Sequence, residues 1–173
     1  MSDTRIPKRY RVISKFYKEK YGEKVYKLPV ALPLTCPNRD GSAGFGGCVF
    51  CGEIGAGYEN RPAWMTVGQQ LAENIAHIGP KYKAKKFIPY YQNFSNTYLP
   101  IEDFKAYMEA GCLDSVVGLA IATRPDCISD AYLDVLKEIE TSYGKDIYIE
   151  LGLQTVNYKT LERSEERRVG KEC

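Results

Sequence analysis

The sequence predicts an α/β fold in which four strand–helix units form one parallel sheet, and three observations support that prediction. Apolar segments of strand length alternate four times with amphipathic segments of helical length, an order that gives parallel strands joined by right-handed crossovers. The 173 residues, 44% of them hydrophobic and 27% charged, are enough for one domain with a sizeable core. Polar residues follow directly after each strand, where the reactive groups of such folds collect: Cys36, residues 92–96, residues 123–126 and Gln154-Thr155.

The expected elements follow one another closely, apart from a glycine-rich loop after the first strand. The expected strands cover residues 25–34, 85–92, 115–123 and 146–155. The expected helices cover residues 8–21, 67–78, 100–111 and 130–143, with a further helical start at 158–162. Thr66 and Ser129 are expected to cap two of these helices, and Gly79-Pro80 is expected to end the first of the two. Pro29 and Pro33 predict irregularity in the first strand.

The composition excludes several classes of protein. No apolar run approaches the length of a membrane span, and the segment MSDTRIPKRYRV lacks the apolar core of a secretory signal, so a cytoplasmic location is expected. Of the 6 cysteines, three crowd into one loop, while Cys112, Cys127 and Cys173 are scattered. That distribution predicts metal or redox chemistry in a reducing compartment rather than a secreted disulfide framework.

The net charge of +2 conceals two strongly basic segments. Residues 1–30 hold nine Lys or Arg against three acidic residues, and KYKAKK covers residues 81–86. Aromatic residues interleave with the first segment: Tyr10, Phe16, Tyr17, Tyr21 and Tyr26. Such patterns suit a polyanionic partner. The alternative interpretation is a solvated amphipathic helix, which is common and carries no information about a partner.

The segment CPNRDGSAGFGGCVFCGEIGAGY, residues 36–58, places three cysteines in the glycine-rich loop. Cys36 and Cys48 have eleven residues between them, and Cys48 and Cys51 have two. A four-iron four-sulfur (4Fe-4S) cluster is normally held by four thiolates, so three would leave one iron open to a small molecule. The glycines permit unusual backbone angles and leave N–H groups free to bond the cluster sulfides.

Other interpretations of the cysteine loop remain open. A zinc site would need a fourth ligand, and the candidates are the single histidine, His77, in the middle of a helix, or the unusual ligands Asp40 and Glu53. A redox disulfide between Cys48 and Cys51 would leave Cys36 unexplained. Cysteines without any function are the remaining interpretation, which the spacing at the end of a strand disfavours.

Several motifs in a fixed order resemble those of radical S-adenosylmethionine (radical SAM) enzymes. They are TCPNRDG at 35–41, GGCVFC at 46–51, FIPYYQNFSNTY at 87–98, ATRPD at 122–126 and ELGLQT at 150–155. The chain is similar to the branch that contains the catalytic subunit of Elongator, and within it to a bacterial family of stand-alone proteins. The resemblance extends from about residue 22 to residue 161. It implies a partial (βα) barrel of the radical SAM type, similar to a TIM barrel and truncated after about four units, since a closed barrel usually needs about eight strands.

The resemblance also implies roles for individual residues. Cys36, Cys48 and Cys51 would ligate three irons, and the methionine part of SAM would chelate the fourth. Phe50 would lie by the adenine of SAM. Three residues after the second strand match positions near the methionine amino group: Gln92, Asn93 and Ser95. Three others match positions near the carboxylate or ribose: Arg124, Glu150 and Gln154. No side chain is assigned a catalytic role.

Each of these SAM contacts has a structural alternative. Phe50 could pack the loop, Gln92 and Asn93 could cap a turn, and Arg124 could pair with Asp126. Cys127 is more simply interpreted as a buried free cysteine. In the fourth strand, alternation puts Glu150, Gly152 and Gln154 on one face and predicts that Leu151 and Leu153 meet the outer helices.

The activity implied by the resemblance is reductive cleavage of SAM to methionine and a 5′-deoxyadenosyl radical, which abstracts a hydrogen atom from a substrate. A low-potential electron donor such as flavodoxin or ferredoxin is the implied partner. The Elongator-like branch suggests modification of wobble uridine in tRNA, which a basic and aromatic N-terminus would suit. The alternatives are a radical SAM enzyme acting on a small molecule, and a non-enzymatic module that binds zinc or an iron–sulfur cluster.

Three segments are expected along the chain. Residues 1–21 form a basic lead-in helix, residues 22–162 form the radical SAM core, and residues 163–173 read as a non-native tail because RSEERRVGKEC has no apolar period. With so few strands, the fragment is expected to be incomplete and weakly active or inactive.

Overall fold

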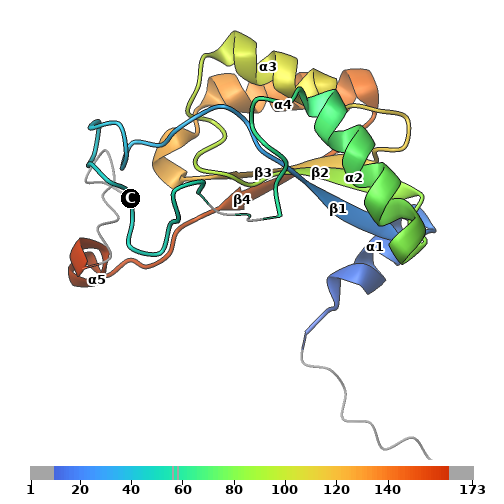
Figure 1. Ribbon diagram of the computed structural model, residues 1–173, viewed down its shortest axis with the longest axis horizontal. Coiled ribbons are helices and arrows are strands. Elements are labelled where there is room, and N and C mark those ends of the chain that lie inside the picture. The colour runs from blue at the N-terminus through green and yellow to red at the C-terminus, as the bar shows by residue number, and fades with distance from the viewer. Residues whose placement is uncertain (1–9, 56, 58, 164–173) are drawn as a thin grey trace, which may run out of the picture.

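A computed structural model describes residues 10–55, 57 and 59–163, and its centre is a four-stranded parallel sheet (Figure 1). The strands lie in sequence order: β1 (Val25–Val30), β2 (Lys86–Tyr91), β3 (Gly118–Thr123) and β4 (Asp146–Leu151). Each strand pairs in parallel with the next, so all four carboxyl ends lie at one edge of the sheet. The predicted α/β fold is confirmed, and the arrangement is consistent with part of a (βα) barrel.

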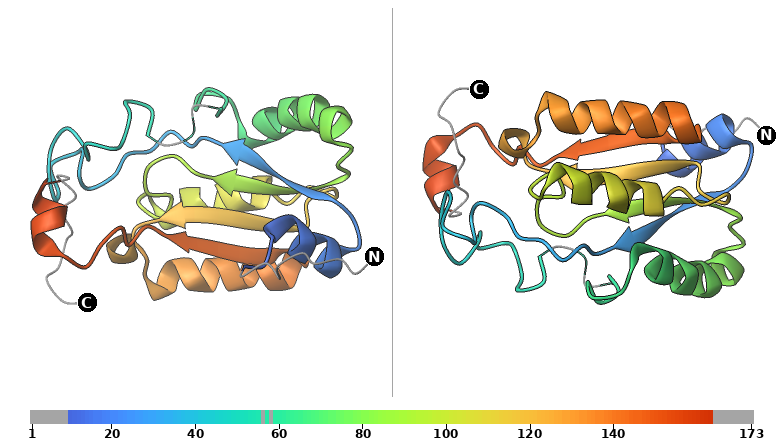
Figure 2. Two further views of the ribbon diagram at one scale, coloured as in Figure 1. Left: turned by 90° about the horizontal axis from the view of Figure 1, so that it is seen from below. Right: turned by 90° about the horizontal axis from the view of Figure 1, so that it is seen from above.

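Three helices follow the first three strands and cover one face of the sheet: α2 (Val67–Tyr82), α3 (Ile101–Ala110) and α4 (Asp130–Tyr143) (Figure 2). The lead-in helix α1 (Ile13–Tyr21) lies over the opposite face, at the amino end of the strands. The short helix α5 (Tyr158–Arg163) lies beyond the carboxyl ends, beside the cysteine loop in both figures. None of the described helices has the length and apolar character needed to cross a bilayer.

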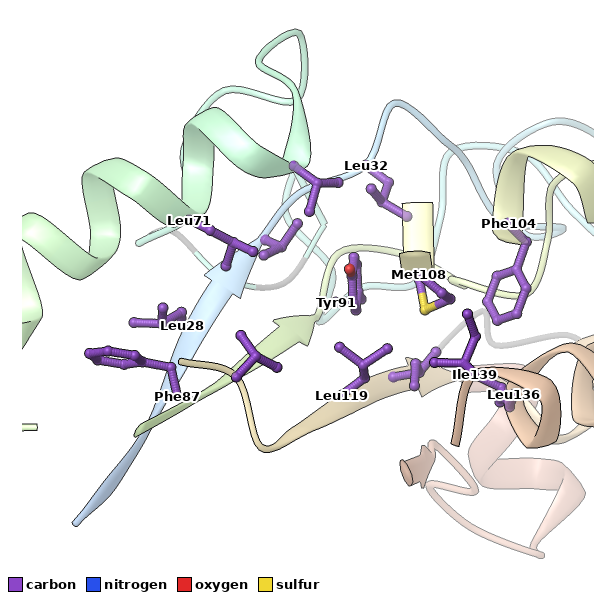
Figure 3. Close-up of a cluster of buried hydrophobic side chains, with 14 of the residues drawn as sticks. Leu28, Leu32, Leu71, Phe87, Tyr91, Phe104, Met108, Leu119, Leu136 and Ile139 are labelled. Carbon is purple, nitrogen blue, oxygen red and sulfur yellow. The ribbon is translucent and has the colours of Figure 1, made fainter. Parts of the chain in front are cut away.

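The main core fills the space between the sheet and helices α2, α3 and α4 (Figure 3). Its fully buried members include Leu28, Leu71, Tyr91, Phe104, Met108, Leu119 and Ile139. Burial of each large apolar side chain stabilises the fold by about 1.5–3 kcal/mol, so this layer holds the strand ends in place. The cavity described below depends on that rigid support.

A smaller cluster closes the amino end of the opposite face. Tyr17 of α1 packs there with Val25, Ile88 and Ala120, one residue from each of the first three strands. Tyr21 of α1 donates a hydrogen bond to Asp146 at 2.5 Å, at the start of β4. Helix α1 therefore covers the amino end of the concave face, which is the face opposite α2, α3 and α4. The carboxyl end of this face stays open for a cavity.

Side-chain amides take the place of a strand partner along the open edge of β1 and just beyond it. Gln70 of α2 bonds both backbone groups of Ala31, at 2.9 and 2.8 Å. Asn74, one turn later, donates to Pro29 O at 2.9 Å. On the opposite side, where β2 pairs with β1, Asn93 bonds both backbone groups of Leu32, at 3.0 and 2.8 Å. All these contacts fix the path of the chain immediately before Cys36, and those from Gln70 and Asn74 blunt an edge that could otherwise pair with another chain.

Several element boundaries differ from the sequence-based expectations. The helix expected to end at Gly79-Pro80 continues to Tyr82, because its last turn closes through Lys83 N–H to the carbonyls of Gly79 and Pro80. The expected strands 25–34, 115–123 and 146–155 are all shorter, ending at Val30, beginning at Gly118 and ending at Leu151 respectively. The lead-in helix begins at Ile13, while residues 8 and 9 lie outside the described residues, as does the tail from 164 onward.

The two expected N-caps occupy the predicted positions but differ in chemistry. Thr66 forms a complete capping box with Gln69, accepting its N–H at 3.2 Å and donating its own N–H to the Gln69 side chain at 2.9 Å. Ser129 stands at the N-cap of α4, but its side chain makes no capping hydrogen bond. Thr66 matters for the site, because α2 carries the amides that hold the chain after β1.

Candidate functional site

A cavity of about 360 Å³ opens at the carboxyl ends of the strands, and all three loop cysteines line it. Residues from the ends of β2, β3 and β4 complete its wall. The remaining lining residues are Phe50, Tyr90, Gln92, Phe94, Ser95, Ala122, Thr123, Arg124, Glu150, Leu151, Gly152 and Gln154. The structure thus brings together every residue predicted for the site except Asn93.

The eleven residues between Cys36 and Cys48 fold back on themselves. An antiparallel bridge joins Asp40 to Phe45, and Ala43 N–H donates to Pro37 O at 2.8 Å. Gly47 N–H then donates to Asn38 O at 2.9 Å, which returns the chain to the neighbourhood of Cys36 just before Cys48. Because the insertion is closed at its base, a gap of eleven residues still delivers both thiols to one cavity.

Arg39 holds the second half of the cysteine loop. Its guanidinium donates to Gly52 O, and to Cys51 O and Glu53 O at 3.4 Å each. The same group lies over the ring of Phe94, 4.9 Å from the centroid. Arg39 therefore links the loop after β1 to the loop after β2, a role that was not predicted. The sequence shows only a single arginine inside a glycine-rich segment, and that pattern does not identify the carbonyls that the arginine binds.

Replacing Arg39 by lysine is expected to loosen the loop without unfolding the sheet. Lysine keeps the charge but lacks the planar fork that reaches several carbonyls at once. Loss of about 1.4 kcal/mol of hydrogen bonding would raise amide exchange of residues 36–53 roughly tenfold in a hydrogen–deuterium exchange experiment. The exposed Arg11→Lys variant is the control, because Arg11 pairs with Glu19 and lies over the ring of Phe16, both of which belong to α1. Unchanged amide exchange in Arg39→Lys would show that the Arg39 guanidinium does not hold the loop.

The electrostatic surroundings of Cys36 combine opposing effects. Burial raises the pKa of its thiol, while a backbone hydrogen bond from Asn38 and the positive charge of Arg124 act in the opposite direction. Cys127 lies behind this wall, and burial followed by the charge of Asp126 raises the pKa of its thiol to about 11. Ser95 bonds the same thiol. Cys127 is thus a free thiol, as the simpler interpretation predicted, but it is half-buried rather than buried, and its raised pKa favours the neutral form.

Arg124 forms a two-pronged ion pair with Asp126, with distances of 2.8 and 2.7 Å. The side chains of both residues are only 10% exposed. The structural alternative proposed for Arg124 is thus observed. The guanidinium nevertheless lines the cavity and acts on Cys36, so the pair holds a positive charge at the cavity wall.

Glu150 is engaged by two neighbours across the concave face. Lys27 of β1 donates to one carboxylate oxygen, and Tyr90 of β2 donates to the other at 2.7 Å. Burial raises the pKa of Glu150, but the bonds from Lys27 and Tyr90 outweigh it and the pKa is lowered overall. The charged carboxylate joins the two edge strands across β2 and β3, and this contact reflects the curvature of the sheet.

Asn93 and Gln92 differ in orientation although they are adjacent. Gln92 lines the cavity, whereas the amide of Asn93 is buried against the backbone of Leu32 and lies outside the lining. Asn96 adds a second anchor by donating to the carbonyls of Tyr91, Asn93 and Ala122. The polar run after β2 is therefore partly a scaffold for the loop.

The predicted packing of the two leucines in and after β4 is wrong. Leu151 is 51% exposed and Leu153 is 44% exposed, so neither is buried against the helices. β4 is the edge of the sheet, and the chain turns at Gln154, which has a left-handed φ of 58°. The opposite side of the alternation agrees with expectation, because Glu150, Gly152 and Gln154 all line the cavity.

The donor set fits an iron–sulfur cluster better than a single metal ion. Within the described ranges, no three His, Cys, Asp or Glu residues could hold one metal ion together. The thiolates of a cluster bond different irons, so they need only surround one cavity, as Cys36, Cys48 and Cys51 do. All three are free thiols, and the positive groups of Arg39 and Arg124 would offset part of their charge.

Comparison with known proteins finds clear relatives, although no family model matches the chain. The chain is 40% identical over 157 residues to uncharacterized protein YtqA of Bacillus subtilis, which is 88% of this chain and 47% of YtqA. It is 37% identical over 145 residues to protein YhcC of Escherichia coli K12, which is 83% of this chain and 45% of YhcC. An uncharacterized protein of Methanocaldococcus jannaschii is 36% identical over 151 residues, 85% of this chain and 45% of that protein.

The chain is homologous to these proteins. It spans about half the length of the relatives it matches. The matches cover 83–88% of the chain.

Proposed function

We propose that the chain is part of a radical SAM enzyme that binds a 4Fe-4S cluster and SAM in the cavity at the carboxyl ends of its strands. The observation that carries this proposal is that three cysteines outside any disulfide line one cavity of about 360 Å³ with the polar residues of three strand ends. Their long first gap departs from the commoner Cys-x3-Cys-x2-Cys spacing of that superfamily but resembles the Elongator-like branch. When bound, such a cluster supplies the electron that cleaves SAM to methionine and a 5′-deoxyadenosyl radical.

The residues of the chain would bind and orient SAM. Cys36, Cys48 and Cys51 would hold three irons, while Arg39 keeps the loop closed. Phe50, which is 58% exposed at the cavity, offers an apolar face for the adenine. Gln92 and Ser95 would bind the methionine amino group, and Arg124 and Gln154 would bind the carboxylate or ribose.

Two residues implied by the resemblance are better supported in an indirect role. The amide of Asn93 is saturated by Leu32, so it would position the loop rather than contact SAM. Glu150 is held by Lys27 and Tyr90, so we assign it to the cavity wall beneath the cofactor. Tyr90 lines the cavity itself, and Lys27 would support the wall through its bond to Glu150.

The leading substrate proposal is tRNA, and it is supported by where the positive charges lie. Lys24 precedes β1 and the basic segment 81–86 leads into β2, so both lie at the amino end of the sheet, opposite the cavity. A strand of six residues spans about 20 Å, so only a ligand of macromolecular size could reach both ends. A folded RNA meets that requirement, and a small-molecule substrate would leave the basic patch unused.

Anaerobic reconstitution tests the radical SAM assignment, preferably in a full-length relative beside this chain. We expect about four irons and four sulfides per chain, bound by three thiolates, and 5′-deoxyadenosine on addition of dithionite and SAM. A colourless protein that binds zinc would contradict the proposal and favour a non-enzymatic module. An iron-replete protein that leaves SAM intact would contradict the radical chemistry alone.

The RNA proposal is tested by tRNA binding over a salt series. Lys85→Glu, in the basic segment, is expected to weaken binding and lower the salt slope by about 1. Lys137→Glu is the matched control, because it makes the same charge change on the exposed side of α4. Equal effects of the two variants, or binding no stronger than that of an unrelated protein of similar charge, would remove tRNA as the partner.

A further inference from the structure

We propose that Asn38 sets the reduction potential of the cluster by donating its side-chain amide to the sulfur of Cys48. This inference rests on the proposed function, because it requires that Cys48 ligate a cluster. Asn38 Nδ2 lies 3.0 Å from Cys48 Sγ. The residue is 1% exposed, so its amide donates from a protein interior and not from solvent.

Asn38 is tied to both ends of the long gap between the first two cysteines. Its backbone N–H bonds the thiol of Cys36, and its carbonyl accepts from Gly47, the residue before Cys48. Three different groups of one residue therefore face Cys36, Gly47 and Cys48. The backbone contacts close the loop and would survive a change of side chain, whereas the amide contact to Cys48 would not.

The direction of the effect follows from charge. Reduction adds an electron to the cluster and its thiolates, so a donor aimed at a ligand sulfur stabilises the reduced state more than the oxidised state. The interaction is strong because burial excludes competing water. Removing the donor should therefore make the cluster harder to reduce, that is, lower its potential.

Asn38→Leu tests this role, because leucine has the same number and branching of side-chain heavy atoms, carries no charge and donates no hydrogen bond. The reconstituted variant is expected to hold the cluster with a potential about 59 mV lower, which is a tenfold change in the ratio of reduced to oxidised cluster. The potential is measured by redox titration followed by electron paramagnetic resonance. Asn157→Leu is the control, since Asn157 is exposed and bonds Thr155 and Thr160.

A second measurement uses the unaltered protein and does not depend on the folding of a variant. Asparagine labelled with ¹⁵N in the side chain is expected to give a hyperfine coupling to the reduced cluster. Absence of that coupling, or equal potentials in Asn38→Leu and wild type, would overturn the inference while leaving the radical SAM assignment intact. A wild-type protein that assembles no cluster would contradict both.

Discussion

Replacing Cys48 by alanine is expected to lower cluster binding by more than about 100-fold, because even the outer partners of metal ligands contribute about 10–100-fold. Cys48 lines the cavity and accepts the amide of Asn38, so its loss removes one iron ligand from a set that has only three. Iron and sulfide content, visible absorbance and 5′-deoxyadenosine formation measure the effect. We expect no detectable SAM cleavage in the variant.

Two cysteines outside the set provide matched controls for this result. Cys112 lies away from the cavity, donates to Met108 O, and has a pKa raised to about 11 by burial. Cys127 is the more demanding control, because it lies near enough to Cys36 for that thiol to contribute to its raised pKa. Both alanine variants should keep the cluster. Loss of the cluster in Cys127→Ala would indicate a fourth thiolate, and full retention in Cys48→Ala would refute the three-cysteine site.

Replacing Gln70 by leucine is expected to destabilise the fold by about 3–5 kcal/mol. The side chain is 0% exposed and bonds Ala31 N, Ala31 O and Met65 O, so leucine would leave three backbone groups without these partners in a dry environment. Each such group costs about 1–3 kcal/mol, partly offset by the apolar contacts that leucine gains. Urea unfolding followed by circular dichroism measures the change.

The adjacent position supplies the matched control. Gln69→Leu makes the same chemical change on the exposed side of α2, where only the capping box with Thr66 is lost, at a cost of about 1 kcal/mol. Because Gln70 also protects the chain after β1, the Gln70→Leu variant should aggregate more readily than the control. Equal stability of the two variants would show that the amide contacts to Ala31 contribute little.

The parts of the site that depend on local sequence patterns could be predicted. The spacing of the cysteines and the polar residues after each strand placed Cys36, Gln92, Arg124 and Gln154 at one edge of a parallel sheet, and all four line the cavity. The same reasoning could not separate Gln92 from Asn93, because both follow β2 and both are primary amides. Which of them faces the cavity depends on the backbone of Leu32, sixty-one positions from Asn93.

Contacts between segments that are distant in the sequence could not be predicted either. Lys27 read as one charge in a basic segment, yet in the fold it crosses the concave face to Glu150 in the last strand. Arg39 and Asn38 had no expected role within the glycine-rich loop, yet they bond Gly52 and Cys48 respectively. The exposure of Leu151 follows from the edge position of β4, which alternation within the strand cannot reveal.

The order of strands and helices, the parallel sheet and the three-cysteine loop are properties of the sequence by itself, because apolar periodicity, caps and ligand spacing act over a few residues. The partners of Asn38, Arg39, Lys27 and Asn93 were decided only by the tertiary structure. Their hydrogen bonds join segments that are brought together when the core between the sheet and helices α2, α3 and α4 forms. The sequence shows which side chains can donate or accept hydrogen bonds. The groups that pair with them depend on which backbone segment is buried beside each side chain in the fold.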